Sequence, residues 1–329
     1  MSVQVSSAAV PGRQAASWRE YLSVARLDHV TKHVFVLPGV MLAFLLRGVQ
    51  TDNILLMALL GLIVAVTIAS ANYTINEYLD RASDRHHPTK SARAAVQTEM
   101  SGTVIFVQWL VLLGVGVTAG YLAGKTMMIT AVLFAAQGVI YNVRPLRTKD
   151  VPYLDVLSEA VNNPFRLMIG WAIIDPSTLP PSSIILAYWF GGAFLMGSKR
   201  LSEYREIVAS HGKDVLARYR KSFHGYTEIS LTTSVFMYAM FSVAFLSIFL
   251  VKYRIEYVLT LPAVTMLFGK YLALSMLPGS TAQKPEHLFK ERGLLGIAAL
   301  VAGLFVLLTF VDMPILDFLT SQRFIQIND

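Results

Sequence analysis

Three polar side chains recur at four-residue intervals near residue 80: Asn76, Asp80 and Asp84, with Glu77 beside the first. On a helix this spacing places them on one face, so several oxygen atoms converge. Neighbouring carboxylates repel unless a cation lies between them. Mg²⁺ is the natural cation, because it accepts one or two carboxylates, retains water and completes its shell with substrate phosphates. The pattern therefore predicts Mg²⁺ as cofactor, held by Asn76, Asp80 and Asp84 in a clamp for a diphosphate.

Two other interpretations of this segment stay open. The acids can belong to a solvated loop in which they pair with Arg81 and Arg85. The adjacent His86 and His87 suggest zinc, although zinc sites normally need further ligands at spaced positions. The chain contains no cysteine, so thiolate ligands, disulfide bonds and thiol catalysis are excluded.

A second acidic pair, Asp155 and Glu159, also has a spacing of four and follows a basic segment. The two acids can hold a second Mg²⁺, and basic side chains nearby can neutralise phosphate oxygens. Those basic residues can equally be the ordinary positive charge of a cytoplasmic loop. Arg166 is the exception, because it falls inside an apolar segment and needs a polar partner there. The candidate substrate-binding residues of this region are Tyr141, Arg144, Arg147, Lys149 and Arg166.

A third polar run holds Lys199, Arg200 and Glu203 and leads into a long polar loop that ends near Tyr226. A loop of this length between apolar segments is commonly functional, as a lid or cap. Its part from residue 207 to 221 can also be a solvated amphipathic helix. We expect the first three residues to reach the same cavity as the acidic clusters and to bind substrate.

The N-terminal segment ends in basic residues. Arg26, His29 and Lys32 recur at helical spacing, and they bind either a substrate lipid phosphate or lipid headgroups in general. The stretch from Ser17 to Leu27 is typical of an interfacial amphipathic helix. Residues 1–32 contain no apolar run of the kind found in a cleavable signal peptide.

The composition determines which elements position these residues. Of the 329 residues, 54% are hydrophobic and only 15% are charged, which is too little charge for the surface of a water-soluble fold. About 20 apolar residues cross a bilayer, so we expect an all-α integral membrane protein. Its helices, about nine, should form a bundle around a polar cavity that faces the cytoplasm. The nine candidate spans are 33–50, 54–75, 102–122, 126–143, 160–175, 183–199, 230–251, 256–277 and 293–312.

The fifth candidate span differs from the others. Segment 160–175 includes Asn162, Asn163, Pro164 and Arg166. A helix facing lipid would not accept these residues, so we expect a short or broken helix that lines a polar interior.

The distribution of charge predicts the orientation. With a cytoplasmic N-terminus, nine spans place 21 of the 28 Lys and Arg residues on the cytoplasmic side, as the positive-inside rule requires. We therefore expect a multi-pass protein of the plasma (inner) membrane whose N-terminus and active site are cytoplasmic. The net charge of +7 reflects this topology, and we expect no nucleic-acid partner.

These clusters resemble those of a known family. The NxxxDxxxD pattern of residues 76–84, the Tyr141–Lys149 segment leading to Asp155, and the nine spans are similar to the UbiA superfamily of intramembrane prenyltransferases. Three stretches look most like its decaprenyl-phosphate phosphoribosyltransferase branch, which some rhizobial nodulation proteins also resemble. They are residues 80–90 with Pro88-Thr89-Lys90, the run Gly197-Ser198-Lys199-Arg200-xx-Glu203, and the loop Lys284-Pro285-Glu286.

The resemblance implies a reaction. That branch transfers 5-phosphoribose from phosphoribosyl diphosphate to a polyprenyl phosphate, towards a lipid-linked arabinose donor. Asn76, Asp80 and Asp84 would bind the Mg²⁺ of the diphosphate, with Asp80, Asp84, Asp155 and Glu159 as the catalytic acids. Lys32, Tyr141, Arg144, Lys149, Arg166, Lys199, Arg200 and Glu203 would contact the substrates. The family usually has Asn-Asp where this chain has Asn76-Glu77, and a tryptophan-containing segment where it has Leu27-Asp28-His29-Val30.

Two alternatives have different chemistry. The first is a conventional prenyltransferase, which uses the same Mg²⁺ clamp for a prenyl diphosphate and an aromatic acceptor. The second is a secondary transporter, although its site would lie near the bilayer midplane, whereas these clusters follow the ends of spans. We expect a tail and interfacial helix over residues 1–32, one catalytic membrane domain over 33–312 and a tail over 313–329.

Overall fold

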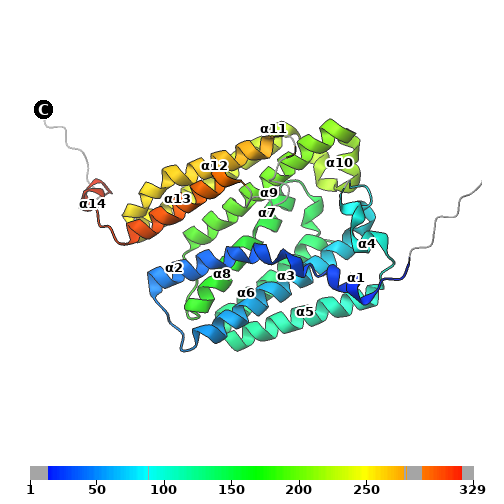
Figure 1. The fold of residues 1–329 in the computed structure, drawn as a ribbon, viewed down its shortest axis with the longest axis horizontal. Helices are drawn as coiled ribbons and strands as arrows, with labels where there is room; N and C mark the ends of the chain where they lie inside the picture. Colours follow the sequence, from blue (N-terminus) through cyan, green and yellow to red (C-terminus); the bar gives the residue numbers. More distant parts are fainter. Residues whose placement is uncertain (1–13, 88, 278, 280–290, 321–329) are drawn as a thin grey trace, which may run out of the picture.

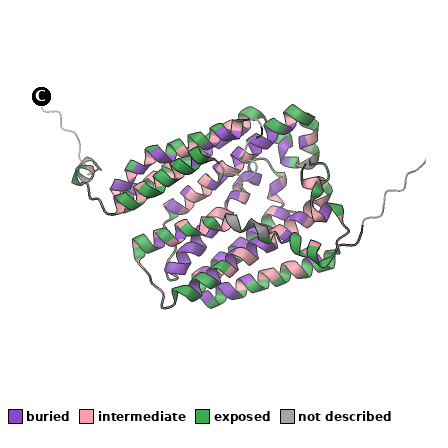
Figure 2. Cartoon of the chain, in the orientation of Figure 1, coloured by how far each residue is buried: buried purple, intermediate pink, exposed green. Residues whose placement is uncertain are grey.

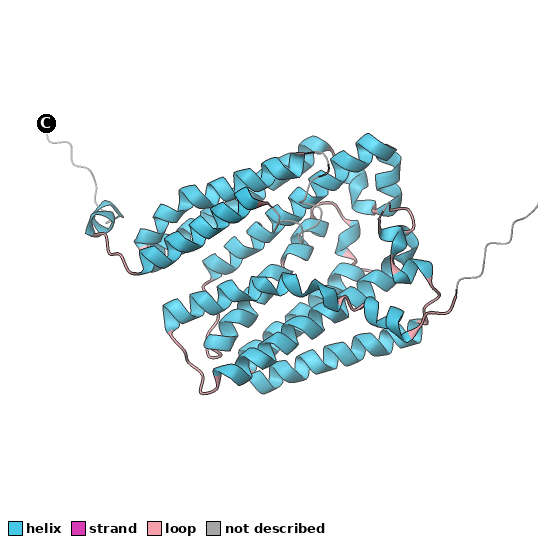
Figure 3. Cartoon of the chain, in the orientation of Figure 1, coloured by secondary structure: helices cyan, strands magenta, loops and turns pink. Residues whose placement is uncertain are grey.

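The computed structural model describes residues 14–87, 89–277, 279 and 291–320, and the regular elements in these ranges are helices (Figures 1 and 3). The Lys284–Glu286 loop lies outside the described residues, and so does the Lys32 side chain. The long helices are α2 (Leu37–Arg47), α3 (Ile54–Asp84), α5 (Gly102–Ala123), α6 (Lys125–Asn142), α8 (Asn162–Ile174), α9 (Ser182–His211), α11 (Glu228–Tyr253), α12 (Leu261–Met276) and α13 (Arg292–Thr309).

Shorter helices connect them and cover one end. They are α1 (Trp18–Ser23), η1 (Leu27–Val36), η2 (Lys90–Ala92), α4 (Ala94–Gln97), η3 (Thr148–Asp150), α7 (Leu154–Ala160), α10 (Lys213–Tyr219), η4 (Lys221–Gly225), η5 (Ile255–Thr260) and α14 (Pro314–Thr320). In α1, Trp18 and Leu22 are exposed, as expected for a helix that lies in a membrane interface.

The helix surfaces are those of a membrane protein. Among the described residues, five segments are long and apolar enough to cross a bilayer: α3, α5, α11, η5 with α12, and α13. Only 17% of the apolar window of α5 and 11% of that of α13 is buried, so their apolar side chains face outward (Figure 2). Lipid, which is itself apolar, accepts such surfaces. A helix covers each of the nine predicted segments, but the number of spans stays a prediction.

The long helices form two groups that lie side by side (Figure 1). One hydrophobic core joins α2, α3, α5, α6 and α8, and includes Ile68, Phe134 and Trp171. A second core joins α7, α9, α11, α12 and α13 around Phe194 and Tyr271. The fifth predicted span is broken at Val161, where α7 ends and the 13-residue α8 begins. This break confirms the expectation drawn from its polar residues.

Two glycines let α8 approach the N-terminal helices closely. A Cβ at Gly39 would lie 2.0 Å from the Leu167 carbonyl oxygen, and one at Gly170 would lie 2.0 Å from that of Val36. Both obstacles are backbone atoms, so no side-chain rotation can relieve the overlap.

We expect Gly39→Ala and Gly170→Ala each to destabilise the protein by about 1–3 kcal/mol or more, because overpacking forces the helices apart. Thermal unfolding in detergent measures the effect. Gly114→Ala is the control, since a Cβ there meets nothing within 4 Å. A melting temperature for the Gly39 and Gly170 variants equal to that of the control would contradict this packing.

A cap covers one end of the bundle. It consists of the end of α9 together with α10 and η4, and Leu201, Leu216, Phe223 and Leu231 form its small hydrophobic core. Within residues 207–221, Leu216 is buried at 1% exposed while Lys213 and Asp214 are exposed, so α10 is amphipathic but packs one face on this core rather than standing free in solvent. The loop was expected to be a lid or cap, and its position over one end agrees with this.

Candidate active site

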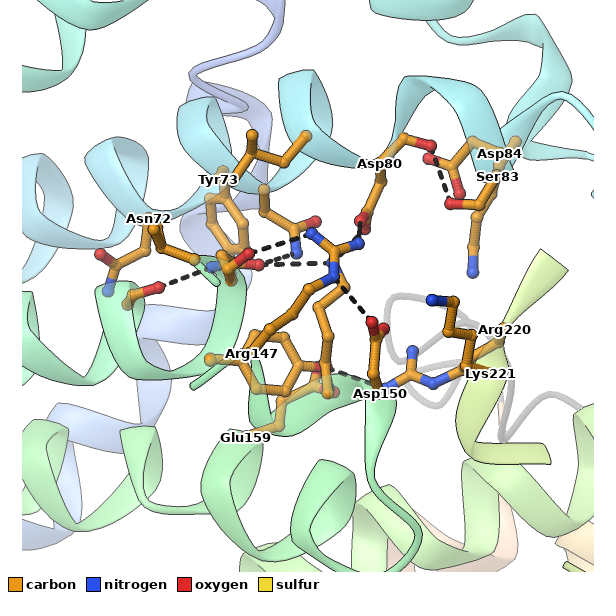
Figure 4. A pocket seen from close by; sticks show the side chains of 18 of the residues that line it. Asn72, Tyr73, Asp80, Ser83, Asp84, Arg147, Asp150, Glu159, Arg220 and Lys221 are labelled. Atoms are coloured by element: carbon orange, nitrogen blue, oxygen red, sulfur yellow. Dashed lines mark hydrogen bonds and ion pairs between the residues drawn. The ribbon is translucent and has the colours of Figure 1, made fainter. Parts of the chain in front are cut away.

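A polar cavity of about 730 Å³ opens beneath the cap, between α3, α6, α7 and α9 (Figure 4). It is the place where the three polar clusters of the sequence meet. Its walls carry the side chains of Asn76, Asp80, Asp84, Tyr141, Arg144, Arg147, Lys149, Asp150, Glu159, Lys199, Arg200 and Arg220, among others. The predicted convergence of the clusters therefore occurs in the fold.

Helix α3 supplies the first cluster because it continues without a break from Ile54 to Asp84. Asn76, Asp80 and Asp84 all line the cavity. Asp80 receives an ion pair from Lys149 and a hydrogen bond of 2.9 Å from Nη2 of Arg147, while Asp84 pairs with Arg93 at 2.7 Å. The Asn76 amide donates to Oδ1 of Asn142 at 2.5 Å.

The alternative in which Asp80 and Asp84 pair with Arg81 and Arg85 is wrong for the described residues. Arg81 instead donates to the Tyr78 carbonyl oxygen at 2.6 Å and stacks over the Tyr78 ring. The acids are turned away from solvent; the cations that Asp80 contacts are 67 and 69 residues away, whereas Asp84 pairs with Arg93, nine residues on.

The loop between α6 and α7 positions Arg147 and Lys149. Arg147 and Tyr153 have positive φ angles of 24° and 65°, a region that non-glycine residues rarely occupy and that is enriched at functional sites. Arg147 then bridges Asp80 and Asp150, with its Nε 3.1 Å from Asp150. Burial lowers the pKa of Lys149 to about 8, although the adjacent Asp80 raises it.

The second acidic pair divides between two environments. Glu159 lines the cavity and accepts a hydrogen bond of 2.8 Å from Tyr141. Burial would raise the pKa of Glu159, but the Arg200 and Arg220 guanidiniums lower it to about 2. Asp155 is 0% exposed and does not line the cavity. The sequence placed both acids at the substrate, whereas the structure places Asp155 behind the wall, in a position to orient other side chains.

Asp155 ties the cap to the bundle. It accepts hydrogen bonds from Tyr226 at 2.6 Å and from Ser222 at 3.0 Å, and it pairs with Arg220 at 3.2 Å and with Arg200 at 3.4 Å. Ser222 lies in the cap, and Tyr226 and Arg220 flank it. The carboxylate therefore joins α7 to both ends of η4.

Arg200 is held by acids on three sides. Besides Asp155, it lies 2.9 Å from Glu159 and 2.9 Å from Glu203. Its side chain is 3% exposed. Arg200 also lines the cavity, so its predicted contact with substrate stays a prediction beside these three ion pairs. Lys199 lines the cavity beside it, and Glu203 is 3.8 Å from Lys90.

Several cavity residues were not among the predicted site residues. Lys90 and Arg93 follow α3, and Arg218, Arg220 and Lys221 come from the cap; Arg26, already a candidate for a lipid phosphate, also lines the cavity. The sequence indicated these residues only through the high density of basic residues at 81–93 and 213–221. Such a density does not distinguish a binding site from the ordinary positive charge of a cytoplasmic loop. Arg166 was predicted to bind substrate, but it is 5% exposed and does not itself line the cavity.

The donor set fits Mg²⁺ rather than zinc. The described residues contain no group of three His, Cys, Asp or Glu side chains placed to hold a metal ion. Two carboxylates and an amide on one helix face provide only part of a shell of oxygen ligands. Mg²⁺ tolerates such a partial shell, because water and substrate phosphates complete it.

Comparison with known proteins shows the family to which this chain belongs. Residues 34–289 match the UbiA prenyltransferase family. The chain belongs to that family. Among curated relatives, it is 29% identical over 160 residues to nodulation protein NoeC of Azorhizobium caulinodans, which covers 48% of this chain and 50% of NoeC. It is 26% identical over 200 residues to protoheme IX farnesyltransferase of Geobacillus kaustophilus, covering 58% and 62%. The matches thus span about half to three-fifths of these relatives.

Solved UbiA structures share the fold. A UbiA homologue from Archaeoglobus fulgidus bound to GPP and Mg²⁺ superposes with a TM-score of 0.65 at 20% identity, covering 89% of this chain and 100% of that chain. The same homologue bound to DMAPP and Mg²⁺ gives 0.65 at 21% identity with the same coverage. Digeranylgeranylglyceryl phosphate synthase gives 0.57 at 14% identity, covering 88% and 96%. The predicted UbiA membership and all-α membrane fold are confirmed.

Proposed function

We propose that this family member is a Mg²⁺-dependent transferase that moves 5-phosphoribose from phosphoribosyl diphosphate to a polyprenyl phosphate of decaprenyl type. The observation that carries the proposal is the charge of the cavity wall. Eleven Lys and Arg side chains line it against four carboxylates. A phosphoribosyl donor brings a third phosphate that a prenyl diphosphate lacks, and the acceptor brings a fourth, so this reaction suits such an excess of cations.

The reaction needs alignment and charge neutralisation rather than a strong base. An oxygen of the acceptor phosphate, already an anion, attacks C1 of the ribose. The bond from that oxygen to C1 forms while the bond from C1 to the diphosphate oxygen breaks, and the diphosphate departs with the electron pair. Arg144, Arg147 and Lys149 stand where they neutralise the leaving group. The 5-phosphate is left for the cations of the cap and of α9: Lys199, Arg218, Arg220 and Lys221.

The metal would be held by the oxygen face of α3. Asn76, Asp80 and Asp84 provide its protein ligands, and bound there it would offset the negative charge that builds up on the leaving diphosphate. Asp80 and Asp84 pair with Lys149, Arg147 and Arg93, so the acids that would hold the metal stand beside cations that would contact phosphate oxygens. GPP and DMAPP with Mg²⁺ in the Archaeoglobus homologue support this use of the site.

The membrane setting accounts for the acceptor. The bundle exposes apolar side chains over α5, α11 and α13, so the long prenyl chain can remain in lipid while its phosphate reaches the cavity. We place the cavity at the cytoplasmic face of the plasma (inner) membrane, because the described basic residues concentrate at that end.

The test uses membranes that contain the protein, labelled phosphoribosyl diphosphate, Mg²⁺ and a polyprenyl phosphate. We expect a labelled lipid that partitions into organic solvent and whose formation stops when EDTA removes Mg²⁺. No such product, with product appearing instead from a prenyl diphosphate and an aromatic acceptor, would overturn the proposal.

A second candidate is prenyl transfer to an aromatic acceptor. The similarity to a protoheme IX farnesyltransferase favours it, and it would use the same face of α3 for a prenyl diphosphate. The two candidates differ in the role of the cap cations. We expect Lys221→Gln to raise the KM for phosphoribosyl diphosphate about tenfold, as loss of one charge-assisted contact does. Under prenyl transfer, the same change would leave the KM for a prenyl diphosphate nearly unaltered.

A further inference from the structure

Arg166 is a buried cation with no counter-ion. It lies on α8 and is 5% exposed. Its Nη1 donates to the Asn162 carbonyl oxygen at 3.2 Å, and its guanidinium lies 5.6 Å from the centre of the Phe134 ring. Its Nε is buried without a hydrogen-bond partner. No carboxylate in the described part of the chain pairs with it.

Burying a guanidinium with so few polar partners costs folding free energy when no ligand is bound. A buried charge normally requires an ion pair or several hydrogen bonds, and one carbonyl contact with one aromatic ring replaces only part of its lost hydration. Arginine at membrane depth is rare and marks functional sites. Because no described carboxylate supplies the missing partner, an anionic ligand would satisfy this cation.

Other unsatisfied polar atoms lie beside Arg166. The Oδ1 atoms of Asn72 and Asn162 are both buried without a partner, and both residues line the cavity. The Asn72 amide nitrogen donates to the carbonyl oxygen of Phe134, the residue whose ring the guanidinium faces. Gly138 leaves room for Asn72, since a Cβ there would lie 1.8 Å from its Oδ1.

This group is separate from the predicted metal site. Asn72 precedes Asp80 by two turns on α3, or about 12 Å along the axis at 1.5 Å per residue. Figure 4 shows Asn72 at the opposite end of the cavity from Asp84. A substrate atom held near Asn72 and Arg166 thus approaches the reacting centre from the interior of the bundle, whereas the diphosphate approaches from the cap.

We propose that Asn72 and Asn162, which line the cavity, and Arg166, which lies next to Asn162, form a subsite for the anionic head of the lipid acceptor, a phosphate monoester. The guanidinium would neutralise the phosphate monoanion, the Asn162 amide nitrogen would donate to one of its oxygens, and the free Oδ1 atoms of Asn72 and Asn162 would accept from its remaining P–OH group. Phe165, which is partly exposed and stacks on the buried ring of Phe134, would offer an apolar surface to the first prenyl unit. The inference rests on the proposed function only in naming the acceptor as a lipid phosphate.

The experiment compares Arg166→Gln with the unaltered protein and with Arg205→Gln, whose arginine is an exposed partner of Glu228. Two quantities are measured in detergent: the melting temperature without ligand, and the affinities for farnesyl phosphate, farnesol and inorganic phosphate. No donor is present, so the result does not depend on whether phosphoribose is transferred. The transfer assay is run separately, and its failure would overturn the proposed function alone.

We expect Arg166→Gln to melt roughly 2 °C or more above the unaltered protein, because an unpaired buried charge has been removed. We also expect it to bind farnesyl phosphate at least about tenfold more weakly, with farnesol affinity unchanged and Arg205→Gln unaltered in both. A lower melting temperature would assign Arg166 a structural role. Undiminished preference for farnesyl phosphate over farnesol would remove it from the subsite.

Discussion

Replacing Asp80 by asparagine is expected to reduce turnover by about a thousandfold or more. The change removes a carboxylate from the site that holds Mg²⁺ against the leaving diphosphate, and such charge stabilisation is worth several kcal/mol in the transition state. The side chain keeps its shape, so the fold should persist. Arg147 retains its contacts with Asp150 and with the Asn142 carbonyl. Turnover and the melting temperature in detergent, measured on the same preparation, check both parts.

Asp150→Asn is the matched control. Asp150 also lines the cavity and pairs with Arg147, but its side chain is 23% exposed and it stands outside the NxxxD face of α3. We expect less than about a tenfold loss of turnover, because Arg147 keeps its ion pair with Asp80 and a partly exposed ion pair contributes about 1 kcal/mol. Asp84→Asn should behave like Asp80→Asn. Activity within tenfold of the unaltered protein in either variant would mean that α3 does not hold the metal.

Replacing Asp155 by asparagine should have the largest effect on stability. The carboxylate is fully buried and joins Arg200, Arg220, Ser222 and Tyr226. Removing its charge deprives buried Arg220 of the carboxylate at 3.2 Å, whereas Arg200 keeps Glu159 and Glu203; breaking such a buried pair costs about 3–5 kcal/mol. We expect a corresponding drop in melting temperature and a raised KM for the phosphorylated donor, because Arg220 loses its anchor.

Asp214→Asn tests whether any change of charge in the cap has this effect. Asp214 lies in the exposed first turn of α10, and substitutions of this kind are usually within about 0.5 kcal/mol of neutral. Equal stability of the Asp155 and Asp214 variants would show that Asp155 does not hold the cap. In that case its proximity to Tyr226 and Ser222 would have no energetic consequence.

The sequence predicted the elements and the position of the site well, for a physical reason. Membrane segments are recognisable because lipid demands long apolar helices. The four-residue spacing of Asn76, Asp80 and Asp84 places these side chains on one face of the helix that contains them. The break at Val161 followed from Asn162 and Asn163 in an otherwise apolar segment. These features are local, so they survive without knowledge of the fold.

Pairings across the fold were not predictable. Asp80 contacts Lys149 from 69 residues away, and Asp155 contacts Tyr226 from 71 residues away. In the sequence, Arg81 and Arg85 are nearer to Asp80 than Lys149 is. The sequence also contains nothing that distinguishes the role of Asp155 from that of Glu159. Glu159 lies on the cavity wall and Asp155 lies behind it, and their four-residue spacing in the sequence does not reveal this difference. Only tertiary packing separates the residue that meets substrate from the residue that holds the cap.

The most direct test of the account measures equilibrium binding of inorganic diphosphate to the purified protein by calorimetry, with and without Mg²⁺. The central claim is that the α3 acids and the facing cations form a diphosphate site completed by the metal. We predict saturable binding with Mg²⁺, at least about tenfold weaker binding without it, and a similar loss in Asp80→Asn. Binding of equal strength in the absence of Mg²⁺, or in the Asp80 variant with Mg²⁺ present, would contradict the account.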